Sequence, residues 1–285
     1  LGAMYGQTSG TMQAHVEGSP VLGLQIGFNA RGALSAVDLA AAGFRGPHDV
    51  IDGPHGYLRL IEGDSFDLDA VRPLIGREWQ IARLAHKPFP SGRLTHGVVD
   101  ALRRLTGAHG FGAADVARIE GRVPPLVMNL VGRPDRPAPE ANYAKLCLAY
   151  VAGAYLVRGQ VDVPEFASPE VLADPAIHEV AGKVELELDG NPDENALVPQ
   201  WFKVTLADGT AHEIELTQVY GHPDVPLTAE ENAVKFRRCV GYGRAAMSEG
   251  QAAALEAAVA EVETLSDAAK LAALTVAPGA RAAAG

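Results

Sequence analysis

Residues 87–96 bring two cationic side chains and a histidine together in a short proline-rich segment, Lys-Pro-Phe-Pro-Ser-Gly-Arg-Leu-Thr-His. Pro88 and Pro90 fix their own φ angles and favour extended backbone in the residues before them, so we expect the segment to be stiff. Lys87 and Arg93 would then hold positive charge around a fixed position, which suits a small carboxylate. Arg93 is expected either to clamp that carboxylate with two hydrogen bonds or to pair with a nearby acidic residue. A proline-rich loop with solvated charges is the alternative for these residues taken by themselves.

The same segment leads into a helix, because apolar residues recur at helical spacing from Val98 to Leu105. We expect the Thr95 hydroxyl to cap the N-terminus of this helix, where the helix dipole attracts anions. The dipole disfavours protonation of His96, so a neutral imidazole is expected that could act as a general acid or base. Bracing of the loop is the alternative role for His96. Ser91 is a candidate for substrate binding.

Composition excludes several classes of function. The chain has 285 residues, 47% hydrophobic residues and a net charge of −11, which is typical of a globular protein without general affinity for nucleic acid or anionic membranes. No apolar run is long enough to span a bilayer. Its two cysteines, Cys147 and Cys239, lie in apolar helical contexts, so we interpret them as packed thiols of a cytoplasmic protein. The histidines show no metal-ligand spacing and no phosphate-binding loop is present, so no metal or cofactor is predicted.

The elements that must position the segment 87–96 are of two kinds. Residues 1–84 are predicted to be mostly helical, with one helix of recurring apolar residues that ends near Gly43. Residues 85–227 are predicted to form an α+β region with an antiparallel sheet. Its expected elements are strands at 117–123, 183–188, 201–206 and 212–217 and a helix at 144–157, closed by Gly159. The last two strands flank Ala-Asp-Gly-Thr, a strong hairpin turn.

Residues 228–285 are predicted to return to helix. Thr228 and Glu231 have the spacing of a capping box, and two alanine-rich helices are expected at 251–265 and 266–274. Residues 277–285 are expected to fray, and the loop 189–199 to be mobile.

The Lys-Pro-aromatic-Pro motif followed by Arg-x-Thr-His and an apolar helix resembles a signature of the MmgE/PrpD family. Four other stretches resemble the family in the same order along the chain. They lie at residues 25–44, 46–57, 144–159 and 226–239, so the resemblance covers about residues 6–240.

The resemblance implies an all-helical domain with an inserted α+β domain, and a lyase that removes a proton next to a carboxylate. It also implies that Lys87 is a site lysine that holds and polarises the substrate and that Gln25 binds substrate. Tyr150 would lie at the active site, where its hydroxyl could hold a carboxylate or relay a proton; simple core packing is the alternative role for Tyr150. Leu22 stands where many relatives have a second lysine, so we expect a substrate with fewer carboxylates than a tricarboxylate, a cation supplied from elsewhere, or a degenerate site.

Members of this family are usually longer at the N-terminus, where the resemblance places the catalytic base. We therefore expect a second chain to supply the N-terminal half, and an oligomer formed through helical surfaces. Two other functions stay open. One is an isomerase or epimerase of a small dicarboxylate, which would return the proton on the opposite face. The other is a non-catalytic subunit of a split enzyme.

Overall fold

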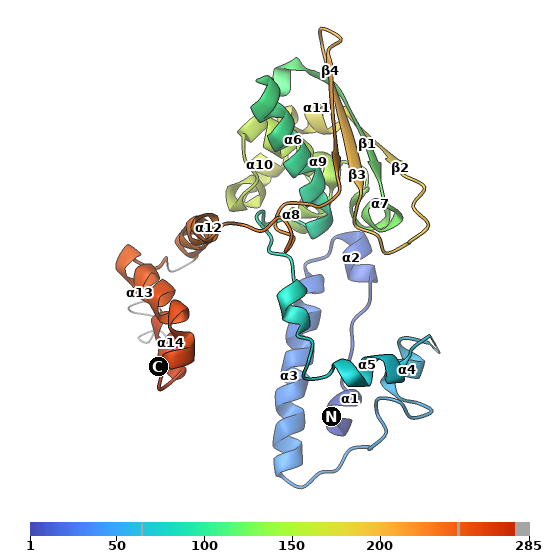
Figure 1. Cartoon of the computed structure of the whole chain (residues 1–285), viewed down its shortest axis with the longest axis vertical. Coiled ribbons are helices and arrows are strands. Elements are labelled where there is room, and N and C mark those ends of the chain that lie inside the picture. Colours follow the sequence, from blue (N-terminus) through green and yellow to red (C-terminus); the bar gives the residue numbers. More distant parts are fainter. Residues whose placement is uncertain (64, 244–245, 277–285) are drawn as a thin grey trace.

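The computed structural model describes residues 1–63, 65–243 and 246–276 and has an α+β fold (Figure 1). The helices are α1 (Gly2–Tyr5), α2 (Gln13–Glu17), α3 (Val21–Ala41), α4 (Tyr57–Leu60), α5 (Leu68–Val71), α6 (His96–His109), α7 (Pro125–Val131), α8 (Ala141–Lys145), α9 (Leu148–Arg158), α10 (Pro169–Leu172), α11 (Pro175–Ala181), α12 (Ala229–Gly241), α13 (Glu249–Ala260) and α14 (Ala269–Leu274). The strands are β1 (Val116–Val123), β2 (Val184–Leu188), β3 (Gln200–Leu206) and β4 (Ala211–Leu216).

The four strands form one mixed sheet in the order β2-β1-β3-β4. β1 pairs with β3 and β3 with β4 in antiparallel fashion, as predicted, but β1 and β2 are parallel. The prediction of an antiparallel sheet was therefore wrong for one pair. The reason lies in the connection: α7 to α11 run between β1 and β2, and a helical crossover of this length returns the chain in the same direction.

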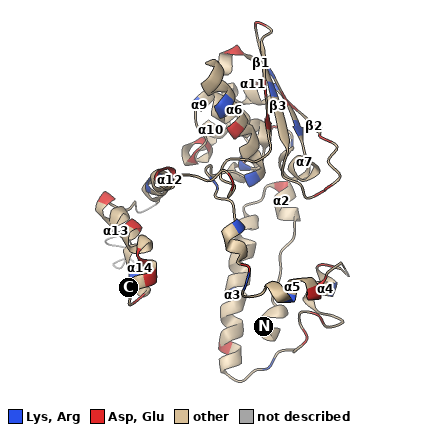
Figure 2. Cartoon of the chain, viewed as in Figure 1, with Lys and Arg blue, Asp and Glu red and all other residues tan. Residues whose placement is uncertain are grey.

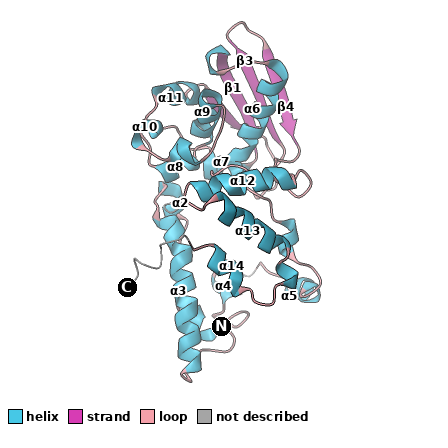
Figure 3. Ribbon diagram, turned by 90° about the vertical axis from the view of Figure 1, so that its left-hand side faces the viewer, coloured by secondary structure: helices cyan, strands magenta, loops and turns pink. Residues whose placement is uncertain are grey.

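Helices α6, α9 and α11 lie along one face of the sheet, and this face carries the core (Figures 1 and 3). In β3 Phe202 and Val204 are fully buried, whereas their neighbours Trp201 and Lys203 point to the other, partly open face. The hydrophobic core cluster extends from Val98 to Leu216, so the sheet and its helices bury a core of their own.

The helices outside the sheet region expose many more large apolar side chains than the sheet region does. Among the described residues, 21 large apolar side chains are exposed before residue 85, whereas only Leu188 and Leu197 are exposed in residues 85–227. In α3 only Gly32 and Ala36 are buried. Among the described residues, most of the apolar side chains that recur along this helix face outwards. The helical segments therefore carry apolar surface that the sheet region does not cover.

Several local predictions are confirmed, and two fail for identifiable reasons. In the capping box, Glu231 N donates to Thr228 Oγ1 at 3.1 Å and Thr228 N donates to Glu231 Oε2 at 2.8 Å. The helix expected at 144–157 is interrupted after α8, because the Lys145 carbonyl accepts a hydrogen bond from Gly92 N (2.8 Å) instead of one from the next turn.

The helix expected at 251–265 ends at Ala260, followed by a short 3-10 turn, and the next helix begins only at Ala269. The loop 189–199 contains no helix or strand, and residues 277–285 lie outside the described residues.

Acidic and basic residues are interspersed along both parts of the chain, in agreement with its modest net charge (Figure 2). No helix in the described ranges has the length and apolar character needed to cross a membrane.

Candidate active site

Lys87 lies on the segment by which the chain passes from the lower helices into the sheet region, drawn in teal in Figure 1. Its Nζ donates to the Ser91 carbonyl at 3.4 Å, across the turn that the two prolines form. Pro88 is buried and Lys87 itself remains exposed. The ammonium is thus tethered at one side and open to solvent on the other, which would leave donors for a ligand.

Two further cations act on Lys87. Partial burial lowers the pKa of Lys87, and so do the positive charges of Arg93 and of Lys235 in α12. Lys235 comes from a helix far along the chain and was not among the predicted site residues, although it lies in a stretch that carries the resemblance. Three cationic groups in one neighbourhood repel each other, and an anion bound among them would relieve that repulsion.

Arg93 is held by backbone carbonyls. Its Nη1 donates to Tyr220 O at 2.9 Å and its Nη2 to Val219 O at 3.0 Å. The two-pronged geometry that was expected to clamp a substrate carboxylate therefore holds the chain as it leaves the sheet region. Arg93 contributes positive charge to the site while its fork is occupied.

His96 is completely buried below the same loop. Its Nδ1 lies 3.4 Å from Arg93 Nη1, and its ring packs edge to face against Phe89 with centroids 5.2 Å apart. Burial, together with the charges of Arg93 and Lys87, lowers the pKa of His96 to about 3. The expected neutral imidazole is present, but in this position it braces the loop, because a buried ring has no direct path to a ligand.

The hydroxyl of Thr95 does not cap α6, contrary to the prediction. Residues Arg93–Thr95 form a 3-10 turn, so Thr95 has helical φ and ψ (−81° and −11°) and its Oγ1 donates back to Gly92 O at 2.9 Å. The same Oγ1 lies 2.8 Å from Ser91 Oγ, and both residues are buried. Ser91 therefore offers Lys87 its carbonyl, while its hydroxyl is occupied within the turn.

Two of the predicted residues make their hydrogen bonds to other segments. The Tyr150 hydroxyl is buried and donates to the carbonyls of Glu165 (3.0 Å) and Val171 (3.3 Å); burial raises its pKa to about 12. Gln25, in α3, accepts from Thr11 N at 2.8 Å through its Oε1. Within the described ranges, no hydrogen bond or ion pair joins either residue to Lys87. The fold brings together Lys87, Ser91, Arg93 and His96, whereas the hydrogen bonds of Tyr150 and Gln25 go to other segments.

A groove between α12 and α13 extends from Lys235. It encloses about 730 Å³ and is mostly apolar. Cys239 belongs to its lining and is exposed, so the prediction of a packed thiol was wrong for this residue. The described residues leave its side of α12 uncovered. Cys147 is buried as predicted.

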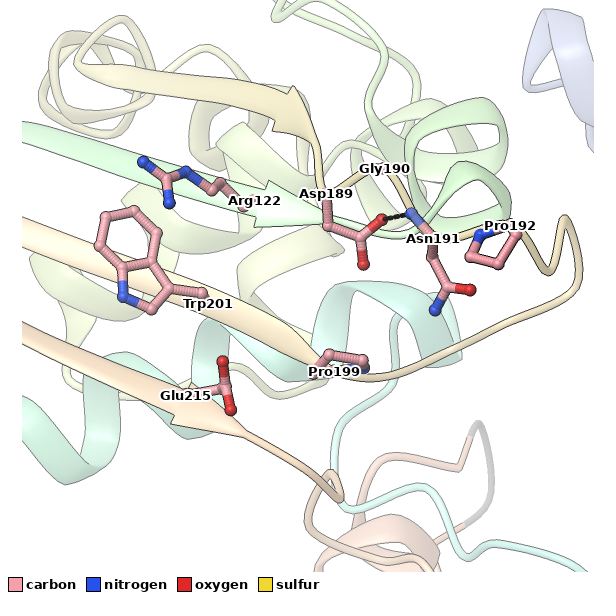
Figure 4. Close-up of a pocket in the computed structure, with 8 residues that line it drawn as sticks. All are labelled: Arg122, Asp189, Gly190, Asn191, Pro192, Pro199, Trp201 and Glu215. Atoms are coloured by element: carbon pink, nitrogen blue, oxygen red, sulfur yellow. Dashed lines mark hydrogen bonds between the residues drawn. The ribbon is translucent and has the colours of Figure 1, made fainter.

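A second cavity, of about 450 Å³, opens at the end of the sheet (Figure 4). Arg122 stacks on Trp201 there with its guanidinium 4.7 Å from the ring centre, and Asp189 and Glu215 flank them. None of the six predicted site residues lines it. In the described part of the chain, no group of three or more His, Cys, Asp or Glu side chains is arranged to hold a metal ion.

The sequence of the chain is similar to those of known proteins. Residues 89–263 match the model of the MmgE/PrpD C-terminal domain. Cis-aconitate decarboxylase from Mus musculus is 30% identical over 225 residues, which are 75% of this chain and 44% of the mouse protein. Cis-aconitate decarboxylase from Homo sapiens is 30% identical over 224 residues, 75% of this chain and 45% of the human protein. The chain thus spans less than half the length of these relatives, and its sequence places it in the MmgE/PrpD family.

Proposed function

We propose that the chain forms the Lys87 part of a lyase site that acts on a small carboxylic acid. In the proposed reaction a proton leaves the carbon next to a carboxylate, and water or another neighbouring group is then lost. The relatives named cis-aconitate decarboxylase support a lyase and a carboxylic acid substrate. Decarboxylation and dehydration are both compatible with this proposal.

The observation that carries the proposal is the Lys87 ammonium, which is tethered to the Ser91 carbonyl, open to solvent and under the positive charges of Arg93 and Lys235. A substrate carboxylate would be held by the open side of the Lys87 ammonium. When the α-proton leaves, negative charge spreads onto that carboxylate, and a fixed ammonium stabilises this charge more than it stabilises the ground state. The positive charge of Arg93 would also stabilise the negative charge on the substrate. Arg93 is already fixed in place, because the carbonyls of Val219 and Tyr220 hold its guanidinium.

The proposed base is not among these groups. His96 is neutral but buried behind Phe89, so we assign it and Ser91 to bracing the turn that carries Lys87. Tyr150 would take part in proton transfer only if its hydroxyl left two carbonyl partners. Gln25 would bind substrate from α3. By analogy with the family, the base belongs to an N-terminal half, which we propose is supplied by a second chain.

The exposed apolar side chains of residues 1–84 support such a partner. A helix such as α3, with Ile26 75% and Leu34 71% exposed, is unfavourable in water and is normally covered. We propose that residues 1–84 and 228–285 form one helical domain with the partner, and that residues 85–227 are inserted into it. Cofactors are not required by this scheme.

The number of cations in the site limits the number of carboxylates that the substrate can carry. Leu22 replaces a lysine of many relatives, which would lower the positive charge of the pocket by one. The positive charge of Lys235 lowers the pKa of Lys87, and we propose that Lys235 supplies the cation that a leucine at position 22 cannot. We propose a substrate with two carboxylates, one at Lys87 and one towards Lys235.

The test begins with native mass spectrometry of the protein purified from its source, which we expect to show a co-purifying chain. That assembly is then incubated with small di- and tricarboxylic acids, cis-aconitate among them, in deuterated water and followed by NMR. A lyase yields a new or rearranged alkene. Lys87→Met should abolish turnover, whereas Lys203→Met, on the open face of the sheet beside Glu120, should not. Equal activity of both variants would contradict the proposal.

The same experiment separates the two other functions. An isomerase or epimerase would place deuterium in recovered or inverted substrate without forming an alkene. A non-catalytic subunit would leave the activity of the assembly unchanged in Lys87→Met.

A further inference from the structure

Gly221 lies against the backbone on both sides of Lys87. Its carbonyl accepts a hydrogen bond from His86 N at 2.8 Å. A Cβ atom at position 221 would lie 2.2 Å from His86 O and 3.1 Å from Pro88 Cδ. Contacts below 3.0 Å do not occur at real Cβ atoms, so a side chain here must push the two segments apart. Gly221 also has a φ of +93°, a conformation that L side chains rarely adopt.

The segment that contains Gly221 is itself fixed to α6. The carbonyls of Val219 and Tyr220 accept from Arg93, so three consecutive carbonyls of this segment have donors in residues 86–93. Tyr220 N donates to Asp100 Oδ2 at 3.2 Å. Asp100 is completely buried in α6 and is held in turn by Arg104, through two bonds of 2.8 and 3.0 Å. The segment 219–221 is therefore a rigid support.

We propose that Gly221 is a positioning residue for Lys87: it lets the segment 219–221, anchored on Arg93 and Asp100, hold His86 and Pro88 and so fixes the lysine between them. The role of Lys87 in holding substrate rests on the proposed function, whereas the positioning of Lys87 by Gly221 rests on backbone geometry alone. The segments that enter and leave the sheet region run side by side here, teal and orange in Figure 1, so their backbones must approach closely.

The experiment compares Gly221→Ala with Gly209→Ala in the purified full chain. Gly209 has a similar φ of +84°, but a Cβ there would meet no heavy atom within 4 Å. Both variants thus carry the same conformational penalty, and only Gly221→Ala adds the clash beside Lys87. The readout is the rate at which a small amine-reactive reagent modifies Lys87 as a function of pH, followed by peptide mass spectrometry.

Gly221→Ala should move Lys87 away from Arg93 and Lys235, so its apparent pKa should rise towards that of an ordinary lysine. At a pH below that pKa, modification of Lys87 should be slower than in the wild type, because a smaller fraction of the amine is deprotonated. Gly209→Ala should keep the wild-type profile. A wild-type Lys87 profile in a folded Gly221→Ala protein would overturn the inference.

A second pair of variants keeps the test decisive if Gly221→Ala does not fold. His86→Pro removes the N–H that donates to Gly221 O, whereas His86→Ala keeps it. The first should shift the Lys87 profile and the second should not; equal profiles would contradict the inference. Because the profile is measured without substrate, failure of the lyase proposal would leave this result unaffected. In an active assembly, Gly221→Ala should lower kcat more than Lys203→Met does.

Discussion

Arg93 Nη1 and His96 Nδ1 are hydrogen-bonded at 3.4 Å. A guanidinium has only donors, so Nδ1 must be the acceptor and the imidazole proton resides on Nε2. The ring is therefore the neutral Nε2–H tautomer, and it cannot gain a second proton without losing this bond and placing two cations side by side. The pair explains why a histidine at this position braces the loop and stays uncharged.

The first prediction concerns acid stability. Because the pKa of His96 is lowered to about 3, the folded state binds fewer protons than the unfolded state between that value and the ordinary histidine pKa of about 6.5. The folded state therefore has its full stability above pH 6.5, and the part that depends on a neutral His96 is lost as the pH falls from about 6.5 to about 3. Between pH 7 and 5, His96 should cost the folded state about 2 kcal/mol. Urea unfolding at both pH values measures this.

His96→Asn keeps an acceptor for Arg93 but cannot be protonated, so its stability should fall less on acidification than that of the wild type. His55→Asn replaces an exposed histidine and should retain the wild-type dependence. Identical pH profiles for all three proteins would show that His96 is not held neutral by its surroundings.

The second prediction concerns His178, whose two ring nitrogens both face acceptors. Nδ1 lies 2.6 Å from Asp135 Oδ2 and Nε2 lies 2.9 Å from Leu172 O. Burial opposes protonation, but the hydrogen bonds to Asp135 and Leu172 outweigh it, so the pKa of His178 is raised. This pair stabilises the fold below the ordinary histidine pKa, and the contribution is lost as the pH rises through the folded-state pKa.

Asp135→Asn removes the negative charge and should lower the His178 pKa, as followed by NMR titration of the ring protons. The stability difference between wild type and variant should shrink as the pH is raised. An unchanged His178 pKa in the variant would mean that the Leu172 carbonyl alone sets it.

The strands and the Lys87 turn could be predicted from sequence because both depend on neighbours in the chain. The alternation of apolar and charged residues predicted β2, and the turn sequence Ala-Asp-Gly-Thr predicted the hairpin between β3 and β4. In the same way Lys87, Ser91, Arg93 and His96 are close in space because they are close in sequence. The parallel pairing of β1 with β2 has no local signal, since it depends on the path of the helices between them.

The residues that sequence reasoning missed all come from distant segments. Lys235 and Gly221 act on Lys87 from more than a hundred residues away, and no pattern of spacing connects them. The break after α8 has a similar origin, because Gly92 takes the carbonyl that would have continued the helix. Arg93 was assigned to substrate because its carbonyl partners, Val219 and Tyr220, could not be foreseen.

The third prediction separates structure from catalysis at Tyr150. Removing its hydroxyl in Tyr150→Phe leaves the carbonyls of Glu165 and Val171 without this donor, so the protein should lose about 1 kcal/mol of unfolding free energy. Tyr155→Phe is the control, since the one hydrogen bond of that hydroxyl among the described residues is a weak contact of 3.5 Å with Thr106 Oγ1. Denaturant unfolding measures both.

We expect the kcat of the folded assembly to be unchanged in Tyr150→Phe. A large loss of kcat without a loss of stability would instead favour the proton-transfer role that the family resemblance implies for this residue.

The fourth prediction uses the two cysteines to report on the groove between α12 and α13. Cys147 is fully buried and burial raises its pKa to about 11, whereas Cys239 is exposed in the lining of the groove. A thiol reagent should therefore modify one cysteine of the native chain and two after denaturation, and Cys239→Ser should abolish the native reaction. If a partner chain covers the helical surface, Cys239 should become protected in the assembly while the denatured count stays at two. Equal labelling of Cys239 in the free chain and in the assembly would show that the partner leaves this groove open.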